Sequence, residues 1–87
     1  MISIDYDIIV FKEDKYYVSY CPELDVSSCG DTVTHAKEML KTAVRLFIEE
    51  AEKMGTLEDI LTEARFTIDD KGRWVPPKLV SIESVSE

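Results

Sequence analysis

The side chains best suited to chemistry lie close together in the stretch YCPELDVSSCGDTVTH. It contains both cysteines of the chain, Cys21 and Cys29, and the single histidine, His35. A structural zinc site takes four Cys or His ligands, so this set is too small to form one. A serine nucleophile needs a base and a group that orients the base, but His35 is near Ser27 and Ser28 in sequence only. We therefore expect no catalytic residue, no metal site and no cofactor, and we expect that the chain is not an enzyme.

The two cysteines are expected to be reduced. The N-terminus, MISIDYDIIVF, has no basic residue and carries two aspartates, which is unlike a signal peptide. No segment of the sequence is long and apolar enough to cross a membrane. We therefore predict a cytoplasmic protein, in which Cys21 and Cys29 stay free and serve as small, partly buried packing residues.

Length and charge narrow the class of partner. The chain has 87 residues, of which 45% are hydrophobic, and this predicts one small globular domain over residues 1–87. It has 18 acidic and 10 basic residues and a net charge of −8. Such a surface repels a phosphate backbone, so we expect no direct nucleic-acid binding. It attracts a basic protein or a cation, although a role in solubility alone is the simpler alternative.

Three strands are predicted before the first helix. Residues 2–11, ISIDYDIIVF, alternate apolar and polar side chains, which is typical of a strand with one buried face. The polar run 12–15 is short enough for a hairpin turn. Aromatic and β-branched residues favour a second strand over residues 16–21, and Pro22 ends it because proline donates no hydrogen bond. A third, short strand is predicted over residues 25–29.

A long amphipathic helix is predicted over residues 33–54. Thr32, or Asp31 beside it, can cap its first free N–H groups, and Gly55 provides the stop. At 100° per residue the apolar side chains cover a sector of about 200°, roughly twice what one sheet needs. The surplus predicts a second packing surface, supplied either by the second helix of this chain or by another chain. The centre of the sector consists of Ala36, Leu40, Ala43, Phe47, Ala51 and Met54.

A short helix and a final strand complete the predicted order. Thr56, with Asp59 three residues later, resembles a capping box for a helix that fades near Arg65. Residues 69–72, DDKG, favour a turn, and the alternation in residues 78–85, KLVSIESV, favours a strand. The predicted fold class is therefore α+β, with a three-stranded antiparallel sheet, a long helix, a short helix and a last strand.

The order and spacing of these motifs resemble the HicB-like antitoxin family. The similar segments are the aromatic strand 16–21, Pro-x-Leu at 22–24, the serine-containing short strand, Gly-Asp-Thr at 30–32 and the amphipathic helix from Ala36 onward. The segments EEAEKMGTLEDILTEARF and GRWVPP look like an extension found in some short members, so the resemblance covers most of the chain. It implies a partial ribonuclease-H-like fold, and a protein that binds and silences a small basic toxin that cleaves messenger RNA.

Two departures from the family pattern bear on stability and function. His35 replaces the glutamate that usually follows the capping threonine by three residues, which predicts the loss of half of a capping box. The residues after Arg65 include Pro76-Pro77 and no amphipathic helix, so they do not match the DNA-binding appendage of many members. We therefore expect no separate DNA-binding domain.

A ribonuclease-H-like fold also raises the question of nuclease activity. That chemistry needs several carboxylates that converge on divalent metal ions. Asp5 and Asp7 share the solvent face of the first predicted strand, whereas Glu38 lies opposite the apolar stripe of the helix. Carboxylates that point apart form no metal cage, so we expect no nuclease activity.

The resulting hypothesis is an acidic antitoxin of a type II toxin–antitoxin system. Its partner would be a basic HicA-like toxin, whose encounter is speeded by charge complementarity and whose complex is held by a few aromatic anchors. The predicted partner-binding residues are the acids Glu23, Asp25 and Asp31, which are expected to face outward, and the anchors Tyr17 and Trp74. A solvated corner for the acids and a core position for Trp74 are the alternatives.

A second hypothesis is an orphan oligomeric module without a toxin, in which the wide helix face packs against a copy of itself. Under either hypothesis we expect a homodimer or a higher homo-oligomer, because exposed apolar surface of this kind usually marks an interface.

Overall fold

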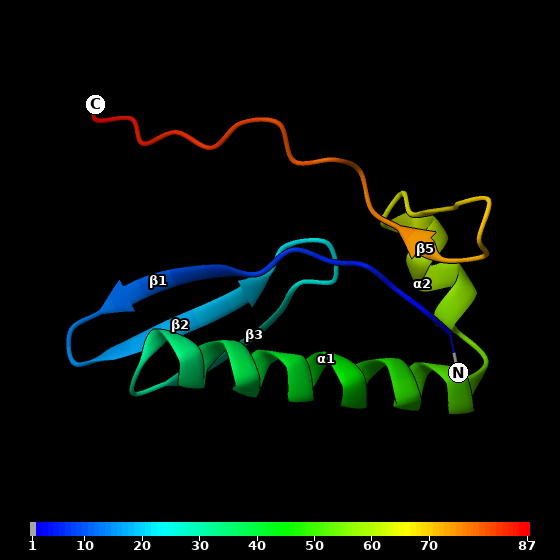
Figure 1. Ribbon diagram of the computed structural model, residues 1–87, viewed down its shortest axis with the longest axis horizontal. Coiled ribbons are helices and arrows are strands. Elements are labelled where there is room, and N and C mark those ends of the chain that lie inside the picture. The colour runs from blue at the N-terminus through cyan, green and yellow to red at the C-terminus, as the bar shows by residue number, and fades with distance from the viewer. Residues whose placement is uncertain (1) are drawn as a thin grey trace.

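A three-stranded sheet packs on one long helix, and a short helix and a hairpin lie at one end of this pair of layers (Figure 1). The computed structural model describes residues 2–87. The elements are β1 (Ile9–Glu13), β2 (Tyr16–Cys21), β3 (Val26–Gly30), α1 (Val33–Met54), α2 (Leu57–Glu63), β4 (Thr67–Ile68) and β5 (Trp74–Val75). The predicted α+β class, with an antiparallel three-stranded sheet, a long helix and a short one, is confirmed. Among residues 2–87, no helix has the length and apolar character needed to cross a membrane.

The strands of the sheet follow the order β1-β2-β3, and both pairs are antiparallel. The turn between β1 and β2 is shorter than predicted, because β1 continues to Glu13 and leaves only Asp14 and Lys15 in the turn. Successive side chains of a strand point to opposite faces of the sheet. In β2, Ser19 and Cys21 are fully buried on the face that meets α1, so the alternate residues of this strand point away from the helix.

The segment before β1 corrects one prediction. Alternation predicted a strand from residue 2, but β1 begins at Ile9. Residues 2–8 contain a single bridge, in which Ile4 pairs in parallel with Trp74 between two backbone hydrogen bonds of 2.9 Å. The alternate apolar side chains of this segment pack against the core without a continuous strand partner; they are Ile2, Ile4, Tyr6 and Ile8.

Helix α1 begins and ends where the sequence predicts. The hydroxyl of Thr32 accepts a 3.0 Å hydrogen bond from the backbone N–H of His35, and Gly55 takes a left-handed conformation after the last turn. The predicted loss of the reciprocal cap contact is wrong in part. The ring Nδ1 of His35 accepts a 3.1 Å hydrogen bond from the backbone N–H of Asp31, one residue before the capping threonine. The imidazole thus makes a contact similar to the one that a glutamate makes in a capping box.

The buried face of α1 is narrower than its apolar sector. Its buried residues are Ala36, Leu40, Val44 and Ala51. Ala43 and Phe47, which the pattern placed at the centre, are half-buried, and Met54 is exposed. The reason is the position of the helix, which packs mainly beneath β3, less beneath β2 and hardly beneath β1. One apolar flank of α1 therefore extends past the β3 edge of the sheet.

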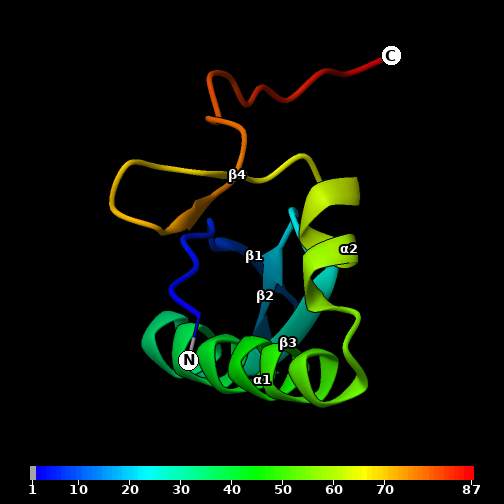
Figure 2. The ribbon, with the colours of Figure 1, turned by 90° about the vertical axis from the view of Figure 1, so that its right-hand side faces the viewer.

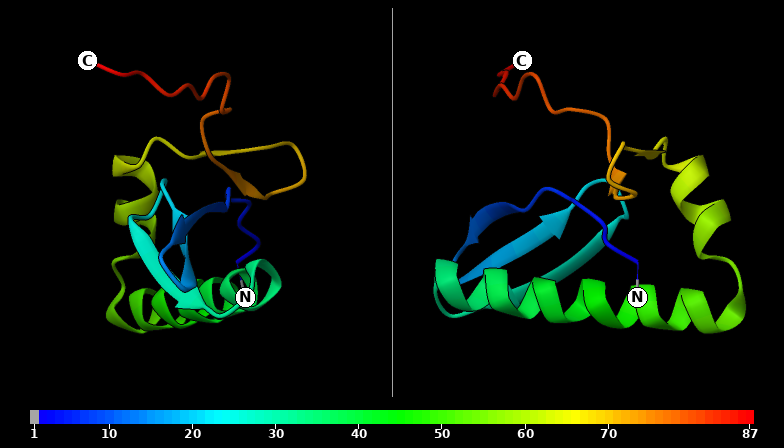
Figure 3. Two further views of the ribbon diagram at one scale, coloured as in Figure 1. Left: turned by 90° about the vertical axis from the view of Figure 1, so that its left-hand side faces the viewer. Right: turned by 45° about the vertical axis from the view of Figure 1, so that its right-hand side comes forward.

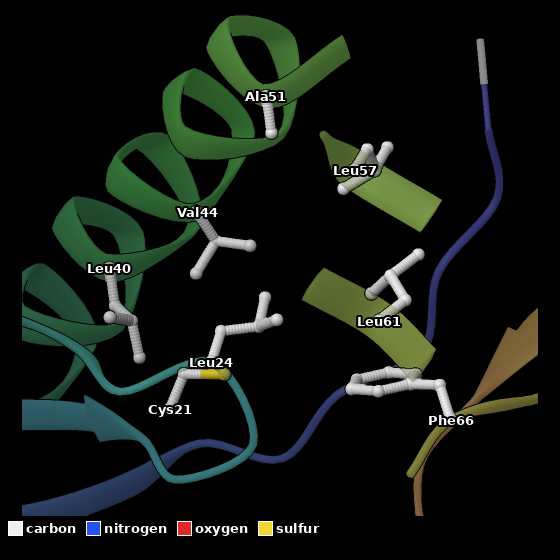
Figure 4. Packing of buried hydrophobic residues seen from close by; sticks show 8 residues of the cluster. All are labelled: Cys21, Leu24, Leu40, Val44, Ala51, Leu57, Leu61 and Phe66. Atoms are coloured by element: carbon white, nitrogen blue, oxygen red, sulfur yellow. The ribbon is translucent and has the colours of Figure 1, made fainter. Parts of the chain in front are cut away.

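The core lies where α1, α2 and the turn between β2 and β3 meet (Figure 4). Leu24, from the Pro-x-Leu motif, points from this turn toward α1 and α2. Phe66 closes the core just after α2. The buried cluster consists of Cys21, Leu24, Leu40, Val44, Ala51, Leu57, Leu61 and Phe66.

The C-terminal third contains two further corrections. Thr56 makes no side-chain cap of α2; its hydroxyl donates a 3.4 Å hydrogen bond to the carbonyl of Ala51 instead. The turn predicted at residues 69–72 is present and joins β4 to β5. The strand predicted at residues 78–85 is not, because the chain leaves the hairpin at Pro76-Pro77 and continues as an exposed extended segment (Figure 2).

Candidate partner-binding site

The face of the sheet that points away from α1 is largely apolar. The register places Phe11, Val18 and Cys29 opposite one another across the three strands. Helix α1 covers the opposite face, and α2 stands beyond one end of the strands (Figure 3). We call this surface the outer sheet face; its residues are Ile9, Phe11, Glu13, Tyr16, Val18, Tyr20, Ser27 and Cys29.

Two aromatic side chains dominate the outer sheet face. Phe11 is 51% exposed and Tyr16 is 44% exposed. Val18 lies directly opposite Phe11, and Tyr16 lies two residues before Val18 on the same face. Large aromatic side chains bury much area for little lost conformational entropy, so they are the usual anchors of protein interfaces. Phe11 and Tyr16 are therefore side chains of the kind that anchors protein interfaces, and both are already exposed on the sheet.

Carboxylates border the outer sheet face at both ends. Glu13 and Asp14 lie exposed at the β1–β2 hairpin, and Asp25 lies exposed in the turn at the other end. The hydroxyl of Tyr20 donates a 2.9 Å hydrogen bond to Oδ1 of Asp25, and this bond raises the pKa of Tyr20. An apolar centre with a charged border is the common arrangement of a protein interface. Lys12 and Lys15 balance the two acids of the hairpin, so the excess negative charge of the border comes from Asp25 and Asp31 at the two ends of β3, and this charge suits a basic partner.

Tyr17, predicted as an anchor, does not lie on this face. It belongs to the same alternate series of β2 as Ser19 and Cys21, which point to α1, and it is half-buried. The ammonium group of Lys12 lies 5.9 Å from the centre of its ring. The sequence missed Tyr16 and Phe11 because both alternate series of β2 are largely apolar, so alternation does not tell which one faces the helix.

Glu23 corrects the prediction that all the acids of the PELD corner face outward. It is half-buried, and its Oε1 accepts hydrogen bonds from the backbone N–H of Asp7 at 3.1 Å and from Sγ of Cys21 at 3.5 Å. Burial raises the pKa of the Glu23 carboxyl. Its contacts hold the N-terminal segment against the corner, so Glu23 serves the fold.

The remaining predicted residues lie apart from one another. Asp25 and Asp31 are exposed, as predicted, at opposite ends of β3. Trp74 is half-buried in β5, where it packs against the core and pairs with Ile4. This matches the core alternative for Trp74. Of the five predicted site residues, Asp25 and Asp31 border the outer sheet face, one at each end of β3.

The carboxylates considered for nuclease chemistry also lie apart. Asp5 forms a 3.2 Å ion pair with Arg73, and Glu38 forms a 3.5 Å ion pair with Lys41 on the exposed side of α1. Within the described residues, no group of three or more His, Cys, Asp or Glu side chains is placed to hold a metal ion.

A second apolar surface lies along the flank of α1 that extends past β3. It is a groove of about 500 Å³ between this flank, the start of β3 and α2. We call it the β3-side groove; it is lined chiefly by Val26, Ala43, Leu46, Phe47, Met54 and Ile60. The excess apolar sector of the helix predicted such a surface, but the sequence did not show which side of α1 it would occupy.

Comparison of the chain with protein-family models, with curated proteins and with solved structures found no match.

Proposed function

We propose that this chain is a HicB-like antitoxin of a type II toxin–antitoxin system, with a partial ribonuclease-H-like fold, that binds and neutralises a small basic HicA-like toxin. The observation that carries the proposal is the outer sheet face, where the exposed rings of Phe11 and Tyr16 lie within a border of carboxylates. The order of motifs from the aromatic strand to α1 supports the choice of family.

Neutralisation of this kind needs binding and no turnover. A toxin that cleaves RNA must present a basic surface to the phosphate backbone. A chain with a net charge of −8 is attracted to that surface. In the proposed complex, Glu13, Asp14 and Asp25 steer the encounter, and Phe11 and Tyr16 lose water against the toxin. The toxin is then silent because its RNA-binding surface is covered.

Co-expression with the product of the neighbouring gene tests the proposal, which requires that product to be a small basic protein. We expect that protein alone to arrest growth, and we expect this chain to restore growth and to elute with it as one complex. The double variant Phe11→Asp, Tyr16→Asp should fail to restore growth. The control is Leu46→Asp, which adds charge to the β3-side groove and should restore growth. Equal arrest with and without this chain, and no shared elution, would overturn the proposal.

The β3-side groove favours a second candidate, an orphan oligomeric module without a toxin. Its apolar lining lies on the flank of α1 that extends past the β3 edge of the sheet. This candidate predicts self-association with no effect of the chain on the growth arrest. The two candidates are therefore separated by the same co-expression experiment.

A further inference from the structure

The sheet ends at β3 and leaves the neighbouring flank of α1 uncovered. β3 is an edge strand, and it pairs with β2 alone among residues 2–87. An edge strand presents unpaired N–H and C=O groups that can accept a further strand. Directly beside it runs the apolar flank of α1, where Leu46 is 58% exposed. A strand added next to β3 would cover this flank and would place the helix beneath the middle of the sheet.

The C-terminal arm, residues 78–87, has the pattern of such a strand and no place in its own sheet. All its residues are exposed, and it forms neither helix nor strand. In extended chain Val80 and Ile82 point to one side, together with Ser84, while Glu83 points to the other. Val80 is 87% exposed and Ile82 is 68% exposed. Apolar side chains at this exposure stay hydrated unless another surface covers them.

The arm and the groove of one chain lie on opposite sides of the molecule. In all four ribbon views the arm runs along the side farthest from α1, which lines the groove (Figures 1, 2 and 3). Pro76-Pro77 sets the direction of departure, because proline fixes its own φ and restricts the residue before it. Lys78 and Leu79, at the start of the arm, line a pocket with Pro22 and Glu23, and this pocket shares no residue with the β3-side groove.

We propose that the C-terminal arm of each copy docks as an additional strand along the β3 edge of a second copy, with Val80 and Ile82 on the β3-side groove. The occupant of the groove is thus a segment of this same chain, supplied by its partner. A closed two-fold exchange uses both arms and both grooves, so neither an arm nor a groove is left to recruit further copies. The proposal does not depend on a toxin and concerns a different surface from the outer sheet face.

The arm is long enough to cover the groove. It spans about 33 Å when extended, at roughly 3.3 Å per residue. The part of α1 that lines the groove runs from Ala43 to Met54, which is about 18 Å at 1.5 Å per residue. Backbone hydrogen bonds to β3 would fix the position of the arm, and burial of Val80 and Ile82 would supply most of the stabilisation.

Two single variants test the proposal, one on each side of the contact. Ile82→Asp places a carboxylate on the arm, and Leu46→Asp places one in the groove. Both side chains are exposed in the single chain, so neither change should unfold it, and circular dichroism checks this. We expect the wild type to be a dimer by light scattering, and each variant to dimerise at least about 100-fold more weakly, because a buried carboxylate without a partner is costly. The matched control is Ser81→Asp, which adds the same charge on the side of the arm that points away from the groove and should weaken dimerisation less than Ile82→Asp does.

A mixture of the two variants distinguishes arm exchange from other dimers. The Ile82→Asp chain keeps an intact groove, and the Leu46→Asp chain keeps an intact arm. Their equimolar mixture should therefore form a heterodimer held by one intact contact, although neither variant dimerises alone at the same concentration. A dimer made by direct packing of two α1 flanks would not be restored in this way.

Three results would overturn the proposal. A monomeric wild type at high micromolar concentration would show that the arm does not bind a second copy. An Ile82→Asp chain that dimerises like the wild type would show that the arm is not the occupant. A mixture of the two variants that stays monomeric would show that arm and groove do not meet. Failure of the antitoxin proposal would leave all three results unchanged.

Discussion

The hydroxyl of Ser19 donates a 2.7 Å hydrogen bond to the carbonyl oxygen of Ala36. Ser19 lies in the central strand β2 and Ala36 lies near the start of α1, and both are fully buried. The bond therefore joins the middle of the sheet to the helix and satisfies a polar side chain inside the core. It also identifies the face of β2 that meets α1, and so leaves the outer sheet face, with Phe11 and Tyr16, free for a partner.

Replacement of Ser19 by alanine should lower the free energy of unfolding by about 1 kcal/mol, the usual net value of one hydrogen bond. Urea denaturation measures the change. The matched control is Ser27→Ala, which alters an exposed serine on the outer sheet face and should leave the midpoint nearly unchanged. If the two variants were equally stable, the bond between Ser19 and Ala36 would not hold the sheet to the helix.

Gly30→Ala should destabilise the chain more strongly. A Cβ atom at this position would lie 2.5 Å from the backbone nitrogen of Ala36, where the end of β3 meets α1. Since the obstructing atom is backbone, the helix itself must move, and we expect a loss of about 3 kcal/mol in the free energy of unfolding. Gly55→Ala is the comparison: its left-handed φ of 70° is unfavourable for alanine but no atom obstructs the new Cβ, so its loss should be about 1 kcal/mol. A smaller loss for Gly30→Ala than for Gly55→Ala would contradict the close packing of β3 on α1.

Stability should fall in alkaline solution because of Cys21. Burial raises the pKa of its thiol from about 9.0 to about 11. Between these values the unfolded chain releases the proton and the native chain keeps it, so the stabilisation is complete below pH 9 and is lost as the pH rises toward 11. As the pH rises over this range, the free energy of unfolding should therefore decrease less for Cys21→Ala than for the wild type. For Cys29→Ala it should decrease as much as for the wild type, because that position is exposed. If the free energy of unfolding decreased equally with pH for Cys21→Ala and the wild type, the buried thiol would not contribute to the loss of stability in alkaline solution.

Local signals in the sequence account for the elements that were predicted correctly. The bounds of α1 follow from Thr32 and Gly55, each of which acts on the turn of helix beside it. Whether an extended segment pairs as a strand depends on residues far from it in the sequence, and alternation within the segment contains no information about them. Residues 2–8 and the C-terminal arm both alternate, yet only Ile4 finds a partner, through Trp74.

The candidate site was harder to predict than the fold. The register shows that Tyr16 and Tyr17 lie on opposite faces of β2, but only the buried contact of Ser19 tells which face is free. The two acids of PELD predict a surface position for Glu23, whereas its contacts with Asp7 and Cys21 hold it in a half-buried position. Such contacts join residues far apart in sequence or depend on the path of a turn, so composition and spacing do not contain them.

The acids that border the outer sheet face should act on the rate of encounter with a basic toxin. Glu13→Lys combined with Asp25→Lys should slow association and weaken its dependence on salt, because exposed charges act over about 8 Å at physiological ionic strength. Dissociation should change less. The control is Glu83→Lys combined with Glu87→Lys, which makes the same charge change on the C-terminal arm. Stopped-flow kinetics that showed equal association rates for both pairs would mean that net charge alone, and not its position, sets the encounter.

The affinity of Tyr16→Ala and Tyr17→Ala for the basic toxin tests the central claim most directly, because these neighbours lie on opposite faces of one strand. Isothermal titration of each purified variant with the toxin gives the dissociation constant. Tyr16→Ala should weaken binding by about 30-fold, or about 2 kcal/mol, as expected for an aromatic anchor, and Tyr17→Ala should bind nearly as well as the wild type. A larger loss for Tyr17→Ala than for Tyr16→Ala, or no binding by the wild type, would contradict recognition of a toxin through the outer sheet face.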